Sequence, residues 1–491
     1  MTDSLPASKV ISLGARLGQL ASQRGGAPAV TDQHRTVTWA ELHARTNRIA
    51  RGLEAAGVRL GDLVTVGLTN SVDFVEACYA LWKVGATPQP ISHRLPPAEA
   101  QAVMDLAATP ILIAGASLGS DRARYDIPAL LALSDDDSDL PDRTAPIYKA
   151  PTSGGSTGRP KLILSGGSGV FDPDMPGAYR SASEDIMLQP GPLYHNGPFT
   201  SSFGGLNQGA HLIVMPRFDA EETLRLIEAH RASWIYTVPT MMSRIWRLPE
   251  GVRSRYDVSS LKTLWHLAAP CPPWLKEAFI TWLGPDVIME LYAGTEAQAV
   301  TIISGTEWLE HRGSVGKVAV GEMLAFDSEG NPLPAGEIGE IYMRRPEGAA
   351  ASYSYRGASA RSLPGGWESL GDIGSFDSDG YLYLADRRTD MILVGGSNVY
   401  PAEIESALDE HPLVQSSAII GLPDEDLGAR IHAIVQPRPG LTEAALREHM
   451  AAMLVTYKQP RSYEFVTENI RDDAGKVRRS QLRDERLAKT G

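Results

Sequence analysis

The sequence is poor in cysteine and contains no long apolar segment. Its 491 residues include two cysteines, Cys78 and Cys271, which lie far apart. A disulfide framework or a cysteine-based metal site is therefore not expected, and a reducing cytoplasm is the expected location. No run of about 18 apolar residues occurs, so we expect no membrane span. Residues 1–20 also lack the basic start and continuous apolar segment of a signal peptide.

An excess of positive charge is absent as well. Lysine and arginine number 46 against 59 aspartate and glutamate residues, which gives a formal net charge of −13. This balance argues against a nucleic-acid partner, although local basic residues can still bind phosphates. The 43% hydrophobic content is typical of a globular protein with an ample core. The length is too great for one ordinary domain.

The hydrophobic pattern alternates between strands and helices, which predicts an α/β fold with parallel sheets. The expected strands are 63–68, 210–215 and 234–238, and the expected helices are 38–56, 71–84 and 220–230. An acidic tract at 135–142 is interpreted as a surface loop. A charged segment at 386–390 predicts the domain boundary. We expect a large N-terminal domain at 1–386 and a small α+β domain at 387–491.

One glycine-rich segment suggests a phosphate-binding loop. It reads Pro-Thr-Ser-Gly-Gly-Ser-Thr-Gly-Arg-Pro-Lys over residues 151–161. Glycine lets backbone N–H groups approach a polyphosphate, hydroxyl side chains add donors, and lysine adds a positive charge. The register does not fit a Walker A loop. Taken alone, the segment is equally typical of a flexible surface loop.

Further motifs downstream favour the phosphate-binding interpretation. They are Tyr-Ala-Gly-Thr-Glu at 292–296, Leu-Gly-Asp at 370–372, Asp-Arg-Arg-Thr-Asp at 386–390 and Gly-Lys at 475–476. With these motifs in this order, the chain from about Thr36 onward resembles the adenylate-forming (AMP-binding) superfamily. That superfamily includes acyl-CoA synthetases, peptide-synthetase adenylation domains and luciferases. The resemblance implies layered sheets and helices in a large N-terminal domain and a smaller, mobile C-terminal domain.

The resemblance implies a site for ATP and Mg²⁺. Glu296 corresponds to the glutamate that helps to hold Mg²⁺, and Thr389 lies at the hinge. Gly154 and Leu162 depart from the family's usual serine and glycine. The residues implied to bind ATP are Ser153, Gly154, Gly155, Ser156, Thr157, Gly158 and Lys161 around the phosphates, Ala268, Ala269 and Tyr292 against adenine, Thr295 at the α-phosphate, and Asp372 and Arg387 at the ribose.

Three further features correspond to the two steps of catalysis in this superfamily. Lys476 matches the lysine that bridges the acid carboxylate and the α-phosphate, so Lys476, His195 and Glu296 are the implied catalytic residues. His195 matches the histidine at the mouth of the acid pocket. Gly395 and Gly396 would line the path of an incoming thiol. The sequence Ile-Arg-Asp-Asp at 470–473 resembles that of ligases for ring-bearing acids.

The segments expected around the acid are mostly apolar and aromatic, although aromatic residues also simply build cores. They show no aspartate or lysine where an amino acid's ammonium would lie, so a bulky apolar acid is favoured. The residues predicted to line the acid pocket are His195, Phe199, Gly204, Tyr236, Val238, Pro239, His266 and Ala293.

These features predict an ATP-dependent ligase. It would convert an apolar, aromatic or alicyclic carboxylic acid into an acyl-adenylate and transfer the acyl group to the thiol of coenzyme A, releasing AMP. Transfer to a free amine, which gives an amide, stays open, as does transfer to a separate carrier protein. A non-catalytic adenylate-binding protein is disfavoured because Lys476, Glu296 and Asp372 are all present. The oligomeric state is left open.

Overall fold

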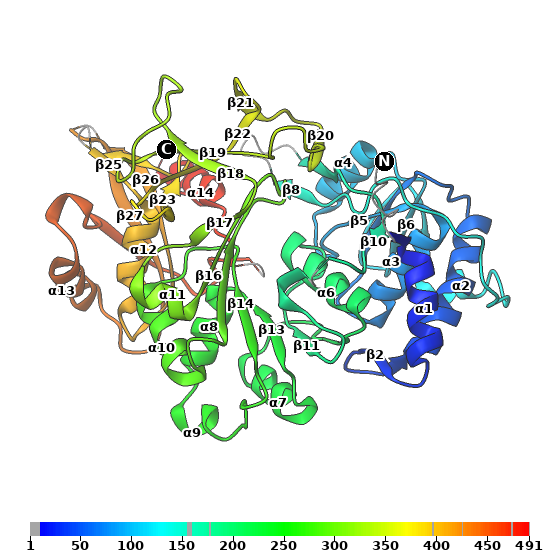
Figure 1. Cartoon of the computed structure of the whole chain (residues 1–491). Coiled ribbons are helices and arrows are strands. Elements are labelled where there is room, and N and C mark those ends of the chain that lie inside the picture. Colours follow the sequence, from blue (N-terminus) through cyan, green and yellow to red (C-terminus); the bar gives the residue numbers. More distant parts are fainter. Residues whose placement is uncertain are drawn as a thin grey trace, which may run out of the picture.

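A computed structural model describes residues 10–154, 160–175, 178–394, 397–424, 426–472 and 475–490 (Figure 1). A large mixed sheet of 14 strands runs through the centre of the part so described. In Figure 1 the N-terminal helices, drawn in blue, lie on one side of the green central strands, and the orange C-terminal elements lie on the other. The α/β architecture predicted from the alternating pattern is confirmed.

One half of this sheet is parallel and buried. Every residue of β13, Trp234–Thr237, is buried, because helices cover both faces of the parallel strands. The parallel strands, in spatial order, are β2 (Pro28–Thr31), β12 (His211–Val214), β11 (Ile186–Gln189), β13, β14 (Thr263–His266) and β15 (Ile288–Tyr292). The helices after them include α6 (Asn196–Gln208), α7 (Ala220–His230), α8 (Pro239–Trp246) and α10 (Pro273–Leu283).

The other half of the sheet is antiparallel and extends from β15. Its strands are β16 (Val300–Ser304), β17 (Gly316–Val320), β23 (Tyr381–Arg387), β22 (Trp367–Phe376), β19 (Gly339–Arg344) and β18 (Glu322–Phe326). Strand β21 (Arg361–Leu363) pairs with β22, and β3 (Thr36–Thr38) closes the opposite edge beside β2. Ligands of open α/β sheets bind at the carboxyl ends of the strands. The segments that follow β13, β14 and β15 are therefore the expected site.

A second, parallel sheet lies in the N-terminal third of the chain. It has the order β5 (Thr87–Pro90), β4 (Leu63–Gly67), β6 (Ile111–Ala114) and β7 (Ala123–Tyr125). The helices α1 (Leu13–Arg24), α2 (Trp39–Ala55), α3 (Val72–Val84) and α4 (Pro97–Ala107) belong to this region. Thr38 and Glu41 form a reciprocal capping box at the start of α2, and Gly85, with φ +82°, ends α3.

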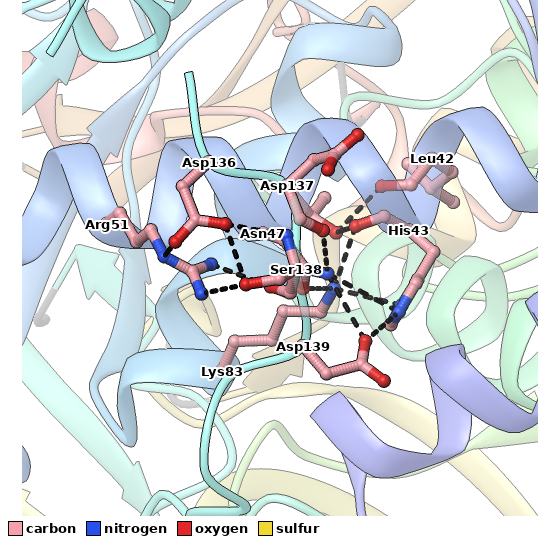
Figure 2. Close-up of polar contacts among 10 residues, drawn as sticks. Leu42, His43, Asn47, Arg51, Lys83, Asp136, Asp137, Ser138 and Asp139 are labelled. Carbon is pink, nitrogen blue, oxygen red and sulfur yellow. Dashed lines mark hydrogen bonds and ion pairs between the residues drawn. The ribbon is translucent and has the colours of Figure 1, made fainter. Parts of the chain in front are cut away.

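The acidic tract at 135–142 is anchored along α2 (Figure 2). The Asp139 carboxylate lies 2.6 Å from Nε2 of His43, and Asn47 Nδ2 donates to the Asp137 carbonyl. Figure 2 shows the Lys83 side chain pointing into the same group of residues. Its Nζ donates to Asn47 Oδ1 at 2.5 Å and to the His43 carbonyl at 3.0 Å. The tract therefore covers a buried lysine.

The C-terminal elements form a small α+β unit with its own core. Strands β26 (Val414–Asp424), β27 (Gly428–Pro437) and β28 (Ser462–Phe465) form its sheet, beside the β24–β25 hairpin at Ile392–Val394 and Ser397–Val399. The core contains Val399, Ile404 and Ile419. Its helices are α12 (Pro401–Glu410), α13 (Glu443–Met453) and α14 (Arg479–Thr490). None of the described helices combines the length and apolar character needed to cross a membrane.

Candidate active site

A cavity of about 2870 Å³ is lined by residues of both the large central sheet region and the small C-terminal unit. Strands β13, β14 and β15 open into it at their carboxyl ends, as the sheet rule leads one to expect. Its walls bring together residues from distant parts of the sequence. Predicted site residues that line it are Lys161, His195, Tyr236, Val238, Pro239, Ala268, Ala269, Tyr292, Ala293, Thr295, Glu296, Asp372, Arg387, Thr389 and Lys476.

Asp372 and Arg387 face each other across neighbouring strands. They are directly paired in the β22–β23 ladder, and Arg387 Nε lies 3.3 Å from Asp372 Oδ1. The Tyr292 hydroxyl donates to Asp372 Oδ2 at 2.6 Å. Burial, and next the Asp372 charge, raise the pKa of Tyr292, so its hydroxyl stays a donor. A carboxylate held in this way keeps free lone pairs for a cis-diol.

A second polar group forms around Glu296. The Lys161 Nζ lies 3.4 Å from Glu296 Oε1, and the Tyr355 hydroxyl donates to the same oxygen at 2.5 Å. Lys161 also donates to the Tyr355 hydroxyl at 3.1 Å. Lys161 lies on β9 (Pro160–Ser165), which is paired with β8 (Thr152–Gly154) on one side and β20 (Tyr353–Arg356) on the other. This small sheet therefore fixes the lysine against the carboxylate.

Tyr355 was not predicted from the sequence. The alternation of Tyr353 and Tyr355 indicates a strand, but it does not reveal that the strand pairs with β9 nearly 200 residues earlier. Of the glycine-rich loop, Ser153 and Gly154 belong to β8, opposite Lys161 and Pro160. Gly155, Ser156, Thr157 and Gly158 lie outside the described residues, and so do Gly395 and Gly396.

The predicted adenine-binding segment follows β14. Ala268 has φ +75°, a left-handed conformation that favours glycine. An alanine is therefore strained at this position. After β15, a Cβ at Gly294 would lie 2.3 Å from Leu370 and 2.9 Å from Glu296 Oε2. Only glycine therefore lets this loop pass close to the carboxylate.

Lys476 is presented by a tight loop of the C-terminal unit. The Asp472 N–H donates to the Lys476 carbonyl, and the Asp472 carbonyl accepts from the Gly475 N–H. The Arg471 side chain donates to the Gly475 carbonyl. Arg471 is in turn held by Glu405 at 2.9 Å. In the sequence, Arg471 is noted only as part of the Ile-Arg-Asp-Asp segment at 470–473. Its position shows that it supports the lysine loop.

The lysine loop is docked against the large domain. Gly475 has φ +76°, and a Cβ built there would lie 2.8 Å from Thr240 Oγ1. The Lys476 side chain is exposed to the cavity. The pKa of Lys476 is lowered, mainly because the surrounding protein removes water from the ammonium and secondly because of the positive charge of Arg387. The Glu296 charge acts in the opposite direction and raises this pKa. An anion bound among these cations would relieve their mutual repulsion.

His195 is the N-cap residue of α6 and lines the cavity. Its ring lies against that of Tyr194, with 4.6 Å between centroids. Burial, and next the charge of Lys476, lower the pKa of His195 to about 4. The imidazole is therefore neutral at pH 7. It can accept or donate one hydrogen bond, but it carries no charge toward the acid.

Three residues predicted for the acid pocket, Phe199, Gly204 and His266, do not line the cavity. Phe199 is 1% exposed and packs against Trp82 and Phe203 in the core. Gly204 lies half-buried farther along α6 and is not part of the cavity wall. Only the first turn of α6 reaches the cavity, through Asn196, Gly197, Pro198 and Thr200; Phe199 turns toward the core there, and Gly204 lies one turn farther along the helix.

His266 does not line the cavity because its side chain points to the other face of β14. Its neighbours Trp265 and Leu267 line the cavity, and successive side chains of a strand point to opposite faces. His266 is fully buried on the other side, with Nε2 3.9 Å from Glu290 Oε2. Burial lowers its pKa to about 4.

The residues of the site fit a Mg²⁺ ion that is bound by one protein carboxylate and by the phosphates of a bound nucleotide. The described residues contain no group of three or more His, Cys, Asp or Glu side chains that could hold a metal ion. Mg²⁺ commonly takes one or two carboxylates and completes its shell with waters and substrate phosphates. Glu296, 5% exposed and beside Lys161 at the cavity wall, offers such a carboxylate.

Comparison with known proteins identifies the family. Residues 18–353 match the family "AMP-binding enzyme", and residues 403–476 match "AMP-binding enzyme C-terminal domain". A feruloyl-CoA synthase from Amycolatopsis sp is 31% identical over 472 residues, covering 93% of this chain and 95% of that protein. The chain therefore belongs to the AMP-binding enzyme family, and the predicted superfamily is confirmed. Its class is that of the AMP-forming acid–thiol ligases.

Two solved structures extend the comparison. An o-succinylbenzoate coenzyme A synthetase from Bacillus subtilis, in complex with ATP and a magnesium ion, has a TM-score of 0.78 at 25% identity, covering 95% of this chain and 98% of that one. The family thus confirms ATP and Mg²⁺ as cofactors. An amide bond synthetase from Marinactinospora thermotolerans has a TM-score of 0.79 at 24% identity, covering 96% and 99%, and shows the shared fold.

Proposed function

We propose that the protein joins an aromatic or alicyclic carboxylic acid to coenzyme A in two steps through an acyl-adenylate, with release of AMP and pyrophosphate. The observation that carries the proposal is the presence of Lys476 in one cavity with the Asp372–Arg387 pair and Glu296. Lys476 comes from the C-terminal unit, whereas Asp372 and Glu296 come from the large one. Such an arrangement suits the first step, because it surrounds two anions that must react with each other.

The residues divide the work as follows. Asp372 accepts hydrogen bonds from the ribose, with Arg387 and Tyr292 fixing its orientation. Lys161 and Glu296 face the departing phosphates, and Glu296 would hold Mg²⁺, which supplies charge neutralisation when bound. Lys476 would offset the charge between the acid carboxylate and the α-phosphate, and its long stem lets it follow both groups.

The acid is proposed to lie against the apolar wall formed by Tyr236, Val238, Pro239 and Ala293. This wall supports a ring-bearing acid, as does the similarity to the feruloyl-CoA synthase. His195, neutral at pH 7, would orient the acid or the incoming thiol without adding charge.

The second step requires the small domain to rotate. We propose that the division lies between residues 386 and 387, just before the last residue of β23, and that Thr389 belongs to the hinge. Rotation would withdraw Lys476 and present Gly395 and Gly396 to the thiol. Rotation of one domain about a short hinge is an established switching device. The cytoplasm remains the predicted location.

A competition experiment tests the acceptor. The protein, MgATP and a panel of aromatic, alicyclic and medium-chain acids would be incubated with coenzyme A and a simple amine together, and the products identified by mass spectrometry. We expect acyl-CoA as the main product, from a ring-bearing acid. Amide as the main product would contradict the thioester step, and preference for a chain acid would contradict the ring-bearing substrate.

A further inference from the structure

A buried lysine that no sequence motif singles out lines the active-site cavity. Lys149 precedes β8, and its backbone is fixed by a hydrogen bond from the Ser165 N–H to its carbonyl. The residue is 9% exposed. The segments that the sequence places around the acid contain neither aspartate nor lysine. Lys149 changes that picture, because it places a cationic side chain in the wall.

The Lys149 ammonium is held at the start of α6, next to His195. Its Nζ donates to Asn196 Oδ1 and, at 2.6 Å, to Thr200 Oγ1. Both partners also line the cavity. An ammonium has three N–H donors, and no acceptor for the third is found among the described residues. None of the described carboxylates forms an ion pair with Lys149.

This position disfavours a positive charge in the free protein. Burial lowers the pKa of Lys149 to about 7. The N-terminal end of a helix carries a partial positive charge, and α6 has no acidic residue in its first turn and no side-chain cap. A buried cation without a counter-ion is costly, and an anion placed beside it restores the balance.

We propose that Lys149 is a specificity-determining residue that pairs with a second carboxylate on the substrate. The preferred acid would then be a ring-bearing dicarboxylate, activated at one carboxylate near Lys476 and held through the other by Lys149. This inference rests on the proposed function. The apolar residues Tyr236, Val238 and Trp265 would contact the ring between the two charged ends.

Matched pairs of acids test the inference. Phthalate, isophthalate and terephthalate would be compared with o-, m- and p-toluate, because each pair differs only in a carboxylate or a methyl group. Acid-dependent pyrophosphate release would be measured for the wild type, for Lys149→Met and for Lys83→Met. Lys83 is the matched control: it is also a buried lysine whose pKa falls to about 7, but it lies outside the cavity.

We expect the wild type to favour one dicarboxylate over its methyl partner by about 10- to 100-fold in kcat/KM, the value of one hydrogen bond to a charged group. Lys149→Met should abolish or invert this preference, and Lys83→Met should keep it. An unchanged preference in Lys149→Met, or a wild-type preference for the methyl member of all three pairs, would overturn the inference. Lys149→Gln, which keeps a polar amide without the charge, should behave like Lys149→Met and serves if that variant does not fold.

Direct binding separates this inference from the proposed function. The same acids would be titrated by calorimetry into the wild type and Lys149→Gln in the presence of ATP without Mg²⁺. Tighter binding of the dicarboxylate that depends on Lys149, without later turnover, would support the role of Lys149 and contradict the ligase proposal. Turnover of toluates with no gain from the second carboxylate would support the ligase proposal and overturn the role of Lys149.

Discussion

Glu296 lies at the cavity wall and is held in place by two neighbours. Its Oε1 accepts a hydrogen bond from the Tyr355 hydroxyl and lies near the Lys161 ammonium. Glu296→Gln would remove the negative charge and keep the side-chain shape. We expect a loss of about 10- to 100-fold in Mg²⁺ affinity or adenylation rate, measured by titrating Mg²⁺ in the acid-dependent reaction. Glu310→Gln, at an exposed position, is the control; an unaltered Mg²⁺ dependence in Glu296→Gln would contradict a metal-binding role.

Asp372 gives a prediction about ATP affinity. Asp372→Asn replaces a carboxylate that accepts hydrogen bonds by an amide that accepts fewer. Because a hydrogen bond to a charged group contributes about 1.5–3 kcal/mol, the KM for ATP should rise about 10- to 100-fold. The KM for the acid should change little. Steady-state kinetics with each substrate varied in turn measures both, with Asp379→Asn in an exposed turn as the control. Equal effects on both substrates would argue against ribose binding.

At the residue scale, the motifs singled out charged and polar residues that lie together in the structure. Lys161, Glu296, Asp372, Arg387 and Lys476 all line one cavity, as the family resemblance implied. Tyr355, Lys149 and Arg471 were not found in the same way. Each acts through partners far away in the chain, and no short pattern in the sequence records such pairing.

At the scale of elements, the position of a residue on its helix or strand explains why three residues predicted for the acid pocket lie outside the cavity wall. Residues of α6 and of the ends of β13 and β14, the segments expected around the acid, line the cavity. Within them, Phe199 and His266 point to the opposite faces. A helix and a strand each have two faces, and composition alone does not decide which face meets the ligand.

The contact between α2, α3 and the acidic tract yields a prediction about pH. Burial lowers the pKa of Lys83 from 10.5 to about 7, with Asp139 raising it and Arg51 lowering it, while the pKa of the neighbouring His43 is also lowered. Between about pH 7 and pH 10 the unfolded chain therefore holds a proton that the folded chain does not. Over this window the lysine's contribution to the free energy of unfolding should increase with pH.

Chemical denaturation of the wild type and Lys83→Met at pH 7 and pH 9 measures this effect. The wild type should gain on the order of 1–3 kcal/mol relative to the variant between the two values. Lys262→Met, at an exposed position, should show no such change. A difference between wild type and Lys83→Met that does not depend on pH would contradict the assignment.

At the scale of the whole molecule, docking of the Lys476 loop links the two domains. Gly475→Ala would place a Cβ 2.8 Å from Thr240 Oγ1 and force a non-glycine residue to φ +76°. The Cβ would push the loop away from Thr240 and displace Lys476, so adenylation should slow by about 10-fold or more. Stopped-flow or quench measurement of the first turnover would record it.

Gly440 offers a matched control for this prediction. It has φ +93° in the same small domain, and no atom of the described residues lies within 4 Å of the position that a Cβ would take there. Gly440→Ala should therefore share the backbone strain but leave the adenylation rate unchanged. Equal slowing in both variants would show that Gly475 acts on the stability of the small domain and not on docking.

The alternation of elements and the motif order together predicted the α/β fold and the two-part chain. The sequence did not reveal which strands pair across long separations, such as β9 with β20 or β17 with β23. The β9–β20 pairing brings the strand of residue 161 beside that of residue 355. Such long-range pairings arise from the packing of the whole chain, which local patterns do not encode. Asp372 lies opposite Arg387 through the local pairing of β22 with β23.

The most direct test of the account is acid-dependent exchange of labelled pyrophosphate into ATP, compared among the wild type, Lys476→Ala and Lys262→Ala. This measurement follows acyl-adenylate formation alone and does not depend on the acceptor. The wild type and Lys262→Ala should exchange at similar rates, and Lys476→Ala should lose about 100- to 1,000-fold because a charge aimed at the transition state is removed. Exchange by Lys476→Ala at the wild-type rate, with an acid that the wild type activates, would contradict the central claim.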